Sequence, residues 1–269
     1  MRTELPLLNI EGTDFFVDVY NLELYEKGRP KNNISIFEMR EVDDGYVFDY
    51  SLKDKNIPST FNPEKVKRVK IPDLVVLDPR NMANKYDILP DQLKGKTDFD
   101  LMVDQKAYDL RVNKGILPTI EIDNHLFFVD LRKDMLRPKD DFLSKGIVFE
   151  DIQHYFSEKN DTYLIPYDPK KHEFCELDYE NLISIPKDLI AVEFPFQKAL
   201  DPIGWNRNGG WNLKESLKQF GLKMQFHAKL IPWDKTFIID VIKSNLEKKQ
   251  NRKKRNLENL SKNKKGRKM

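Results

Sequence analysis

Leu5 to Tyr20 reads LPLLNIEGTDFFVDVY, and Leu117 to Arg132 reads LPTIEIDNHLFFVDLR. Aligned without a gap, so that Leu5 corresponds to Leu117, the two segments are identical at seven of sixteen positions. Unrelated segments of ordinary composition would share about one position in sixteen. Because similar segments at a fixed spacing are the signature of an internal repeat, the sequence predicts a tandem duplication of one unit.

The similarity continues further along the chain. Ile36-Phe37-Glu38 corresponds to Val148-Phe149-Glu150, and Leu77-Asp78-Pro79 recurs as Leu200-Asp201-Pro202. A third, partial start can be traced from Leu230. The sequence therefore predicts a first repeat unit at 1–112, a second at 113–232, a C-terminal helix or partial third repeat at 233–246, and a basic flexible tail at 247–269.

Each copy opens with a hairpin pattern. Ile120-Glu121-Ile122 alternates apolar and polar residues, and Asp123-Asn124 supplies a turn before an aromatic and β-branched run. Glu11-Gly12 is the corresponding turn of the first copy. Two-residue hairpin turns need positive φ, which Gly and Asn tolerate. A second strand pair is expected over residues 35–50, with its turn at 43–45.

The helix signals come later in each copy. Leu74–Leu77 is expected to be a short buried strand that leads into Asp78-Pro79. An aspartate N-cap followed by proline begins a helix, here over residues 79–88. Lys214–Phe220 is also expected to be helical, and residues 235–249 fit helix or strand, with helix favoured from about Thr236. The expected fold class is α+β, with mostly antiparallel hairpins and a late helix.

Charge is distributed unevenly along the chain. The segment from Lys243 to Met269 holds twelve Lys and Arg residues against two acidic ones, a net charge of +10. The overall net charge is +2, so the part of the chain before Lys243 carries −8. A basic segment of this kind attracts polyanions through release of counterions. We expect it to contact nucleic acid non-specifically through Lys248, Lys249, Arg252, Lys253, Lys254, Arg255, Lys262, Lys264, Lys265, Arg267 and Lys268.

Other interpretations of the basic segment stay open. It could be a solubilising extension, a site that docks on an acidic protein, or a helix that folds on a partner. A membrane role is not expected, because no apolar run approaches the length of about 18 residues that a bilayer requires. No secretory signal is visible, and a single cysteine, Cys175, excludes an internal disulfide framework. The sequence predicts a cytoplasmic protein.

The aspartates Asp18 and Asp130 recur at the repeat spacing, and Asp201 is the aspartate of the second Leu-Asp-Pro motif. Equivalent residues of a duplicated fold can meet at a pseudo-two-fold axis, where carboxylates could do acid–base work. The competing interpretation is that each binds its own turn or faces solvent. An enzyme with a carboxylate-lined site in the cleft between the repeat units is therefore the alternative hypothesis.

The segment Pro202–Trp211 holds Trp205, Arg207 and Trp211 together with three glycines. Exposed Trp and Arg are common anchors at protein interfaces, although the same tryptophans could pack inward. No phosphate-binding glycine loop and no metal-ligand motif occurs, and His172 with its acidic neighbours is only a loose cluster. We expect no cofactor and no metal. The leading hypothesis is a non-enzymatic binding or accessory protein whose duplicated body contacts an unidentified protein and whose tail contacts nucleic acid.

Overall fold

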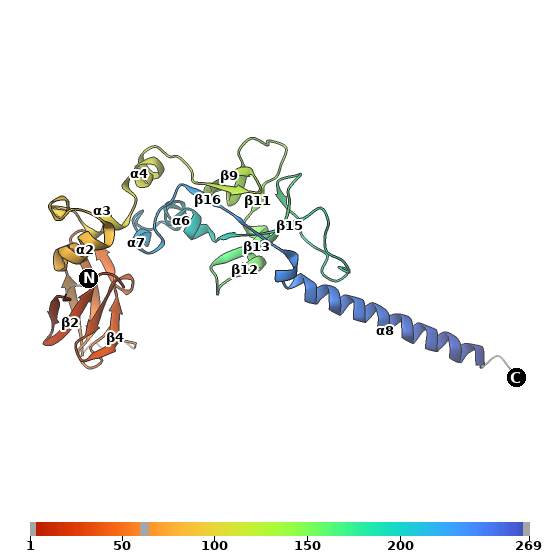
Figure 1. Ribbon diagram of the computed structural model, residues 1–269, viewed down its shortest axis with the longest axis horizontal. Coiled ribbons are helices and arrows are strands. Elements are labelled where there is room, and N and C mark those ends of the chain that lie inside the picture. The colour runs from red at the N-terminus through yellow and green to blue at the C-terminus, as the bar shows by residue number, and fades with distance from the viewer. Residues whose placement is uncertain (1–3, 60–64, 266–269) are drawn as a thin grey trace. The chain divides into compact units, whose positions relative to one another are not determined.

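The computed structural model describes residues 4–59 and 65–265, and its ribbon is drawn in Figure 1. The chain divides into two compact units. Unit 1 comprises residues 1–113 and 211–222, and unit 2 comprises residues 114–210 and 223–269. The segment 211–222 thus belongs to unit 1, although it lies within the second predicted repeat of the sequence.

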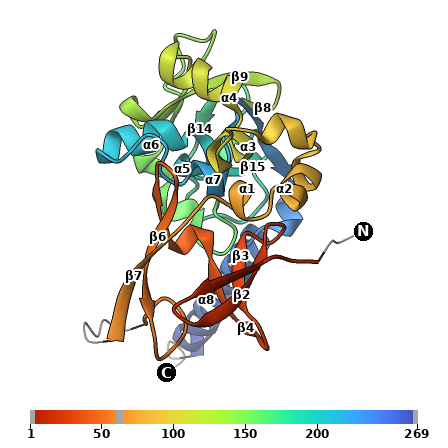
Figure 2. The same ribbon diagram turned by 90° about the vertical axis from the view of Figure 1, so that its left-hand side faces the viewer.

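Unit 1 begins with an antiparallel meander of four strands in the order β1-β2-β3-β4 (Figure 2). The predicted turn is confirmed, because Ile10 pairs with Thr13 and leaves Glu11 and Gly12 as the two loop residues. Their φ angles of 49° and 80° are those that a primed hairpin turn requires. The strands are β1 (Leu7–Ile10), β2 (Thr13–Asp18), β3 (Glu23–Glu26) and β4 (Arg29–Ser35).

A second sheet of unit 1 contains three strands, β5 (Arg40–Val42), β6 (Gly45–Ser51) and β7 (Val66–Ile71). The expected strand pair is present from Arg40 onward, since Val42 pairs with Gly45 across the predicted turn. Residues 36–38 differ from the prediction and form the 3-10 helix η1 (Ile36–Glu38). Ser35 and Glu38 form a capping box there, which satisfies the N–H groups that a strand would have placed in a ladder.

The helices of unit 1 follow β7. Leu74–Leu77 is the helix α1, so the prediction of a strand there was wrong. A run of four apolar residues has no period that separates a strand from a buried turn of helix. The helix α2 (Pro79–Tyr86) is confirmed, with the Asp78 carboxylate accepting the Asn81 N–H at 3.1 Å. The remaining helices are η3 (Pro90–Leu93), α3 (Asp98–Met102), α4 (Gln105–Tyr108), η4 (Asp109–Asn113) and α7 (Leu217–Phe220).

The helix predicted over Lys214–Phe220 is present only as the single turn α7. Gly221 ends it at φ 70°, a backbone conformation that glycine adopts without steric cost.

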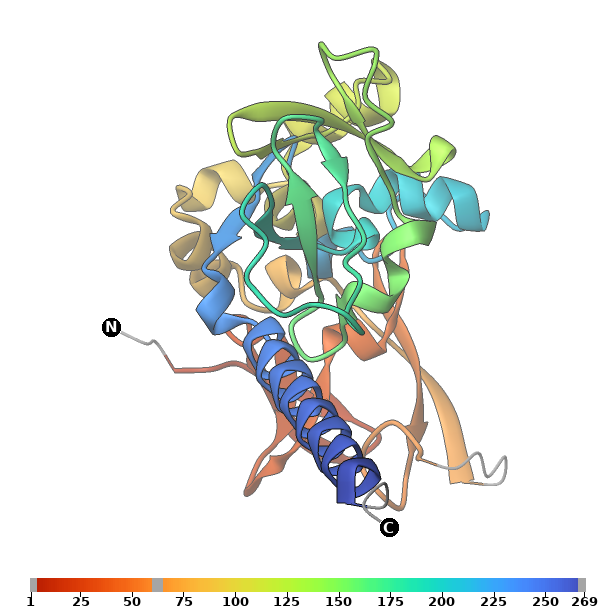
Figure 3. The ribbon, with the colours of Figure 1, turned by 90° about the vertical axis from the view of Figure 1, so that its right-hand side faces the viewer.

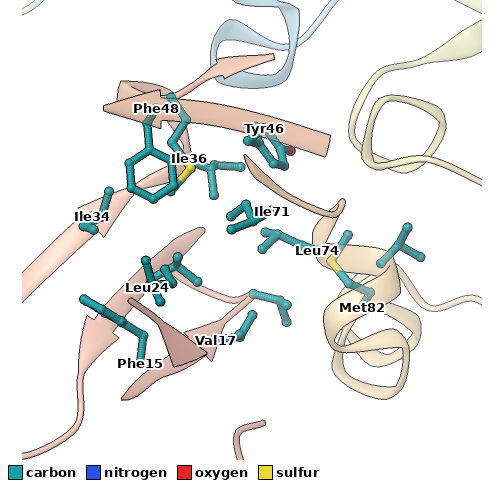
Figure 4. Packing of buried hydrophobic residues seen from close by; sticks show 14 of the residues in the cluster. Phe15, Val17, Leu24, Ile34, Ile36, Tyr46, Phe48, Ile71, Leu74 and Met82 are labelled. Carbon is teal, nitrogen blue, oxygen red and sulfur yellow. The ribbon is translucent and has the colours of Figure 1, made fainter. Parts of the chain in front are cut away.

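One core holds the elements of unit 1 together (Figure 4). Side chains from both sheets and from α1 and α2 point toward one another there, among them Phe15, Leu24, Tyr46, Leu74 and Met82. The alternate residues of β2 follow this pattern, because Phe15 and Val17 are buried while Phe16 on the opposite face is only half-buried. The hydrophobic periodicity of the opening segment therefore corresponds to the inward face of the first sheet.

Unit 2 has two sheets of five strands. In the first, the predicted hairpin is confirmed, with Ile122 paired to His125 around Asp123 and Asn124. This sheet contains β11 (Ile147–Val148), β10 (Met135–Pro138), β9 (His125–Asp130), β8 (Thr119–Ile122) and β16 (Gln225–His227), of which β16 is parallel to β8. The second contains β12 (Phe156–Ser157), β13 (Thr162–Asp168), β14 (Glu173–Phe174), β15 (Ile190–Pro195) and β17 (Lys229–Ile231).

Shorter helical elements complete the body of unit 2. They are η5 (Leu131–Lys133), η6 (Glu150–Tyr155), α5 (Gln197–Leu200), α6 (Pro202–Gly209) and η7 (Trp233–Lys235). The segment Pro202–Trp211 is mostly helix α6, because Asp201 caps it and Pro202 takes its first position.

The last element of unit 2 is α8 (Ile238–Lys265), a single unbroken helix (Figure 3). The favoured prediction of helix after Thr236 is confirmed, and the second half of the supposed third repeat is therefore not a strand. The sequence predicts a flexible tail from residue 247, whereas the backbone stays helical to Lys265. Residues 238–265 contain no glycine or proline, and fifteen of these 28 residues are Lys, Arg, Glu or Leu, which have high helix propensity.

The fold class is α+β, built from several mainly antiparallel sheets and a late helix. Among the described residues, no helix is both long enough and apolar enough to span a bilayer.

Candidate functional site

The exposed cations of α8 form the most distinctive surface of unit 2. Lys248, Lys249, Arg252, Lys253 and Lys254 are all exposed. Within the part of the chain whose side chains are described, none of the five takes part in an ion pair with a carboxylate. Like charges three or four residues apart on a helix repel one another. The helix therefore presents cationic charge that an anionic partner would stabilise.

The other predicted cations are placed by their backbone alone. Arg255, Lys262, Lys264 and Lys265 lie on the helical backbone of α8, whereas Arg267 and Lys268 fall outside the described residues.

The first turns of α8 are fixed to the body of unit 2. Ile238 is buried, and the Asn245 amide donates to the carbonyl oxygens of Tyr179 and Leu182 at 2.8 and 2.9 Å. Asn245 is itself buried, so these bonds satisfy polar groups that water cannot reach. The anchor fixes the direction and the rotation of the helix at the point where its basic residues begin.

A pocket of about 260 Å³ opens where α8 leaves this anchor. Lys248, Lys249 and Arg252 line it from the helix, and Asn181 and Ile183 line it from the segment between β14 and β15. The helix residues follow Asn245 by three, four and seven positions, which places them on the same face as the anchor.

Unit 1 holds a second cluster, in which a lysine is buried. The Lys218 side chain is 5% exposed, and its ammonium group donates to the Tyr46 hydroxyl at 2.8 Å and pairs with Glu41 at 3.2 Å. The Tyr46 hydroxyl donates to Asp98 at 2.7 Å. Asp98 also accepts the N–H groups of Leu74 and Val75 at the start of α1, at 2.7 and 2.8 Å. This Lys218–Tyr46–Asp98 network joins the segment 211–222 to β6, α1 and α3.

The network is suited to holding these segments in place rather than to proton transfer. Burial and the neighbouring Asp98 carboxylate raise the pKa of Tyr46 far above its ordinary value, so its phenol stays protonated. Burial, followed by the Asp98 charge, raises the pKa of Asp73 to about 6. Sequence analysis missed the cluster, since Lys218 and Tyr46 are 172 residues apart.

The three aspartates considered for catalysis take structural roles. Asp18 accepts the N–H groups of Tyr20 and Asn21 in the turn after β2. Asp130 is the N-cap residue of η5 and lies 3.6 Å from the Arg137 guanidinium. Asp201 accepts the Gly204 N–H at 2.9 Å as the cap of α6. Asp18 lies in unit 1 and the other two lie in unit 2.

The predicted anchor residues are divided between the two units. Trp205 is half-buried, packs on the core of unit 2 and meets the Phe196 ring edge-on at 6.4 Å. Arg207 is exposed at the end of α6. Trp211 is 53% exposed and belongs to unit 1.

The loop between β10 and β11 holds two apolar side chains that are more exposed than either tryptophan, and the sequence does not predict them. Phe142 and Leu143, in the loop between β10 and β11, are 92% and 96% exposed. Asp141 accepts the N–H groups of Leu143 and Ser144, and its other oxygen lies 2.9 Å from Nδ1 of His172. The loop thus presents two large apolar side chains on a hydrogen-bonded base.

His172 stacks on His125 with ring centroids 3.6 Å apart. Burial, followed by the charge of His172, lowers the pKa of His125, which favours the neutral form of the His125 imidazole. Over residues 4–59 and 65–254, no group of three His, Cys, Asp or Glu side chains is arranged to hold a metal ion.

Comparison of the chain with protein families, curated proteins and solved structures finds no match in any of the three.

Proposed function

We propose that the protein is a non-enzymatic accessory protein that contacts nucleic acid through the basic residues of α8. The observation that carries this proposal is the row of exposed cations from Lys248 to Lys254, on a helix anchored by Asn245. Phosphates that neutralise Lys and Arg release condensed counterions, which favours binding without reading the base sequence. The net charge of −8 on the part of the chain before Lys243 confines this contact to the helix.

Truncation tests the proposal. A chain that ends at Leu246 keeps Ile238 and Asn245 but loses eleven of the basic residues. We expect the full chain to bind a labelled oligonucleotide in fluorescence anisotropy and the shortened chain to show no binding at the same salt concentration. Circular dichroism of both chains serves as the control for folding. Equal binding by the two chains would place the contact in the body and contradict the proposal.

We further propose that the body supplies a protein-interaction surface, with the Phe142–Leu143 loop as its centre. Exposed large apolar side chains at a fixed position are typical anchors of protein interfaces. A photoreactive amino acid at position 142 should crosslink to a discrete partner protein in cells that make this protein. The same group at the exposed Lys159 serves as the control, and identical crosslinks from both positions would contradict this assignment.

The two predicted repeats, residues 1–112 and 113–232, are, in this proposal, copies of one structural unit. The hairpin registers support it, because Leu8 pairs with Phe15 and Ile120 pairs with Phe127, at the same constant spacing as the sequence repeat. The helix starts support it too. Asp78-Pro79 and Asp201-Pro202 each begin a helix of eight residues with the same side-chain cap.

A further inference from the structure

Three basic side chains converge on the pocket beside the Asn245 anchor, and this convergence distinguishes them from the other cations of α8. Lys248, Lys249 and Arg252 line the pocket, whereas Lys253 and Lys254 do not. At 100° per residue, Lys254 points to the opposite side of the helix from Asn245. If charge alone mattered, all five cations would contribute equally to anion binding. The pocket instead predicts that the three cations that line it contribute more than the other two.

The pocket has the chemistry of a phosphate site. Three cations face one acidic lining residue, Glu180, which leaves a net charge of +2 on the walls. An arginine guanidinium can donate two parallel hydrogen bonds to phosphate oxygens, and a lysine contributes a compact charge. Ile183 is 42% exposed and adds an apolar surface against which a sugar or a base can pack.

Part of the pocket wall is already ordered before binding. A ligand that binds there therefore costs less conformational entropy than one that binds to an isolated helix. Asn181, on the opposite wall, is held by two bonds to the Asp178 carboxylate, at 3.2 and 2.8 Å. Asn245 joins the helix to the same segment through the carbonyl groups of Tyr179 and Leu182. Both walls are therefore held in place before a ligand arrives, which lowers the ordering cost of binding.

We propose that this pocket binds one backbone phosphate of a nucleic acid and so fixes the strand on α8. The inference rests on the proposed function and deepens it. One phosphate is bound at a defined place in the pocket, and the other cations of α8 attract the strand without a fixed contact. The distinguishing contact is the guanidinium of Arg252, whose planar fork Lys cannot reproduce.

Matched double variants of the full chain test the inference. Lys249→Gln with Arg252→Gln removes two positive charges from the pocket, and Lys253→Gln with Lys254→Gln removes two from outside it. With a labelled single-stranded oligonucleotide, we expect the pocket pair to weaken binding at least about tenfold more than the outside pair. Arg252→Lys, which keeps the charge, should still weaken binding several-fold. All these side chains are exposed, so unfolding of the variants should match that of the wild-type chain.

The outcomes separate the two proposals. Equal losses in the two pairs, with Arg252→Lys neutral, would overturn the pocket and leave diffuse nucleic-acid binding intact. No binding by the wild-type chain would overturn the proposed function itself. Inorganic phosphate, titrated by calorimetry, separates the sources of the anion. If it binds the pocket while the oligonucleotide does not, the assignment to a nucleic-acid backbone is wrong.

Discussion

Asp73 is a buried carboxylate at the start of α1 in unit 1. Burial and the Asp98 charge raise its pKa to about 6, and the Lys218 ammonium and a hydrogen bond from the Asp98 backbone offset this only in part. In the unfolded chain an aspartate has a pKa of about 3.9. The folded state therefore binds more protons between these values, and the stability that Asp73 contributes is lost as pH rises through about 6.

Asp73→Asn should remove the loss of folding stability that accompanies ionisation of Asp73. We expect the variant to be more stable than the wild-type chain at pH 7.5, by at most about 3 kcal/mol, and to have no such advantage at pH 4. Hydrogen exchange of unit 1 peptides at both pH values measures the effect, because a chain of two units need not unfold in one step. Asp91→Asn, at an exposed position of the same unit, is the control. An advantage that is equal at both pH values would contradict the assigned cause.

Element by element, the hairpins are the part of the fold that the sequence predicts best. Their strands alternate apolar and polar residues, and their turns carry Gly12 or Asn124 at positive φ. Both signals are local, so neither needs knowledge of distant contacts. Phe15 in β2 and Phe127 in β9 are the matching inward residues, and both are fully buried.

Truncating these two phenylalanines tests the equivalence of β2 and β9. Phe15→Ala and Phe127→Ala should each destabilise their own unit by about 3–5 kcal/mol, because each leaves a cavity in a closed core. The half-buried neighbours Phe16 and Phe128 are matched controls, at which the same change should cost less. Urea unfolding followed by hydrogen exchange of each unit measures the losses. A loss at position 15 and none at 127 would contradict the structural equivalence.

Two elements show where sequence reasoning fails. The sequence predicts a strand over Leu74–Leu77, although four apolar residues fit the period of a helix equally well. Hydrogen bonds from its first two N–H groups to Asp98 favour the helix. That carboxylate lies 24 residues from Leu74, so no local pattern contains it. For α8, the sequence predicts a flexible tail from residue 247, whereas the helix propensity of its residues continues the helix to Lys265.

At the scale of the molecule, only one part of the candidate site, the basic segment, could be predicted from the sequence. The basic segment is contiguous, so composition alone located it. The pocket was not visible, because Asn181 and Ile183 are contributed by a segment far before Arg252 in the chain. The Lys218–Tyr46–Asp98 network was missed for the same reason, since it joins residues from four separate elements of unit 1.

The charge distribution of the whole chain predicts how binding responds to salt. A net charge of +10 lies on the segment from Lys243 to Met269 and −8 on the rest, so attraction to a polyanion should come from one end of the sequence. For single-stranded nucleic acid, the logarithm of the binding constant falls with the logarithm of salt concentration by about 0.7 per neutralised phosphate. Contacts by the five exposed cations from Lys248 to Lys254 would give a slope of about −3.5.

Measuring that slope for the full chain tests the central claim most directly. Anisotropy titrations of a single-stranded oligonucleotide at several salt concentrations should give a slope of about −3 or steeper. The chain ending at Leu246 should show no measurable binding at any of them. A slope near zero, or a shortened chain that binds with the same slope, would show that α8 is not the nucleic-acid contact.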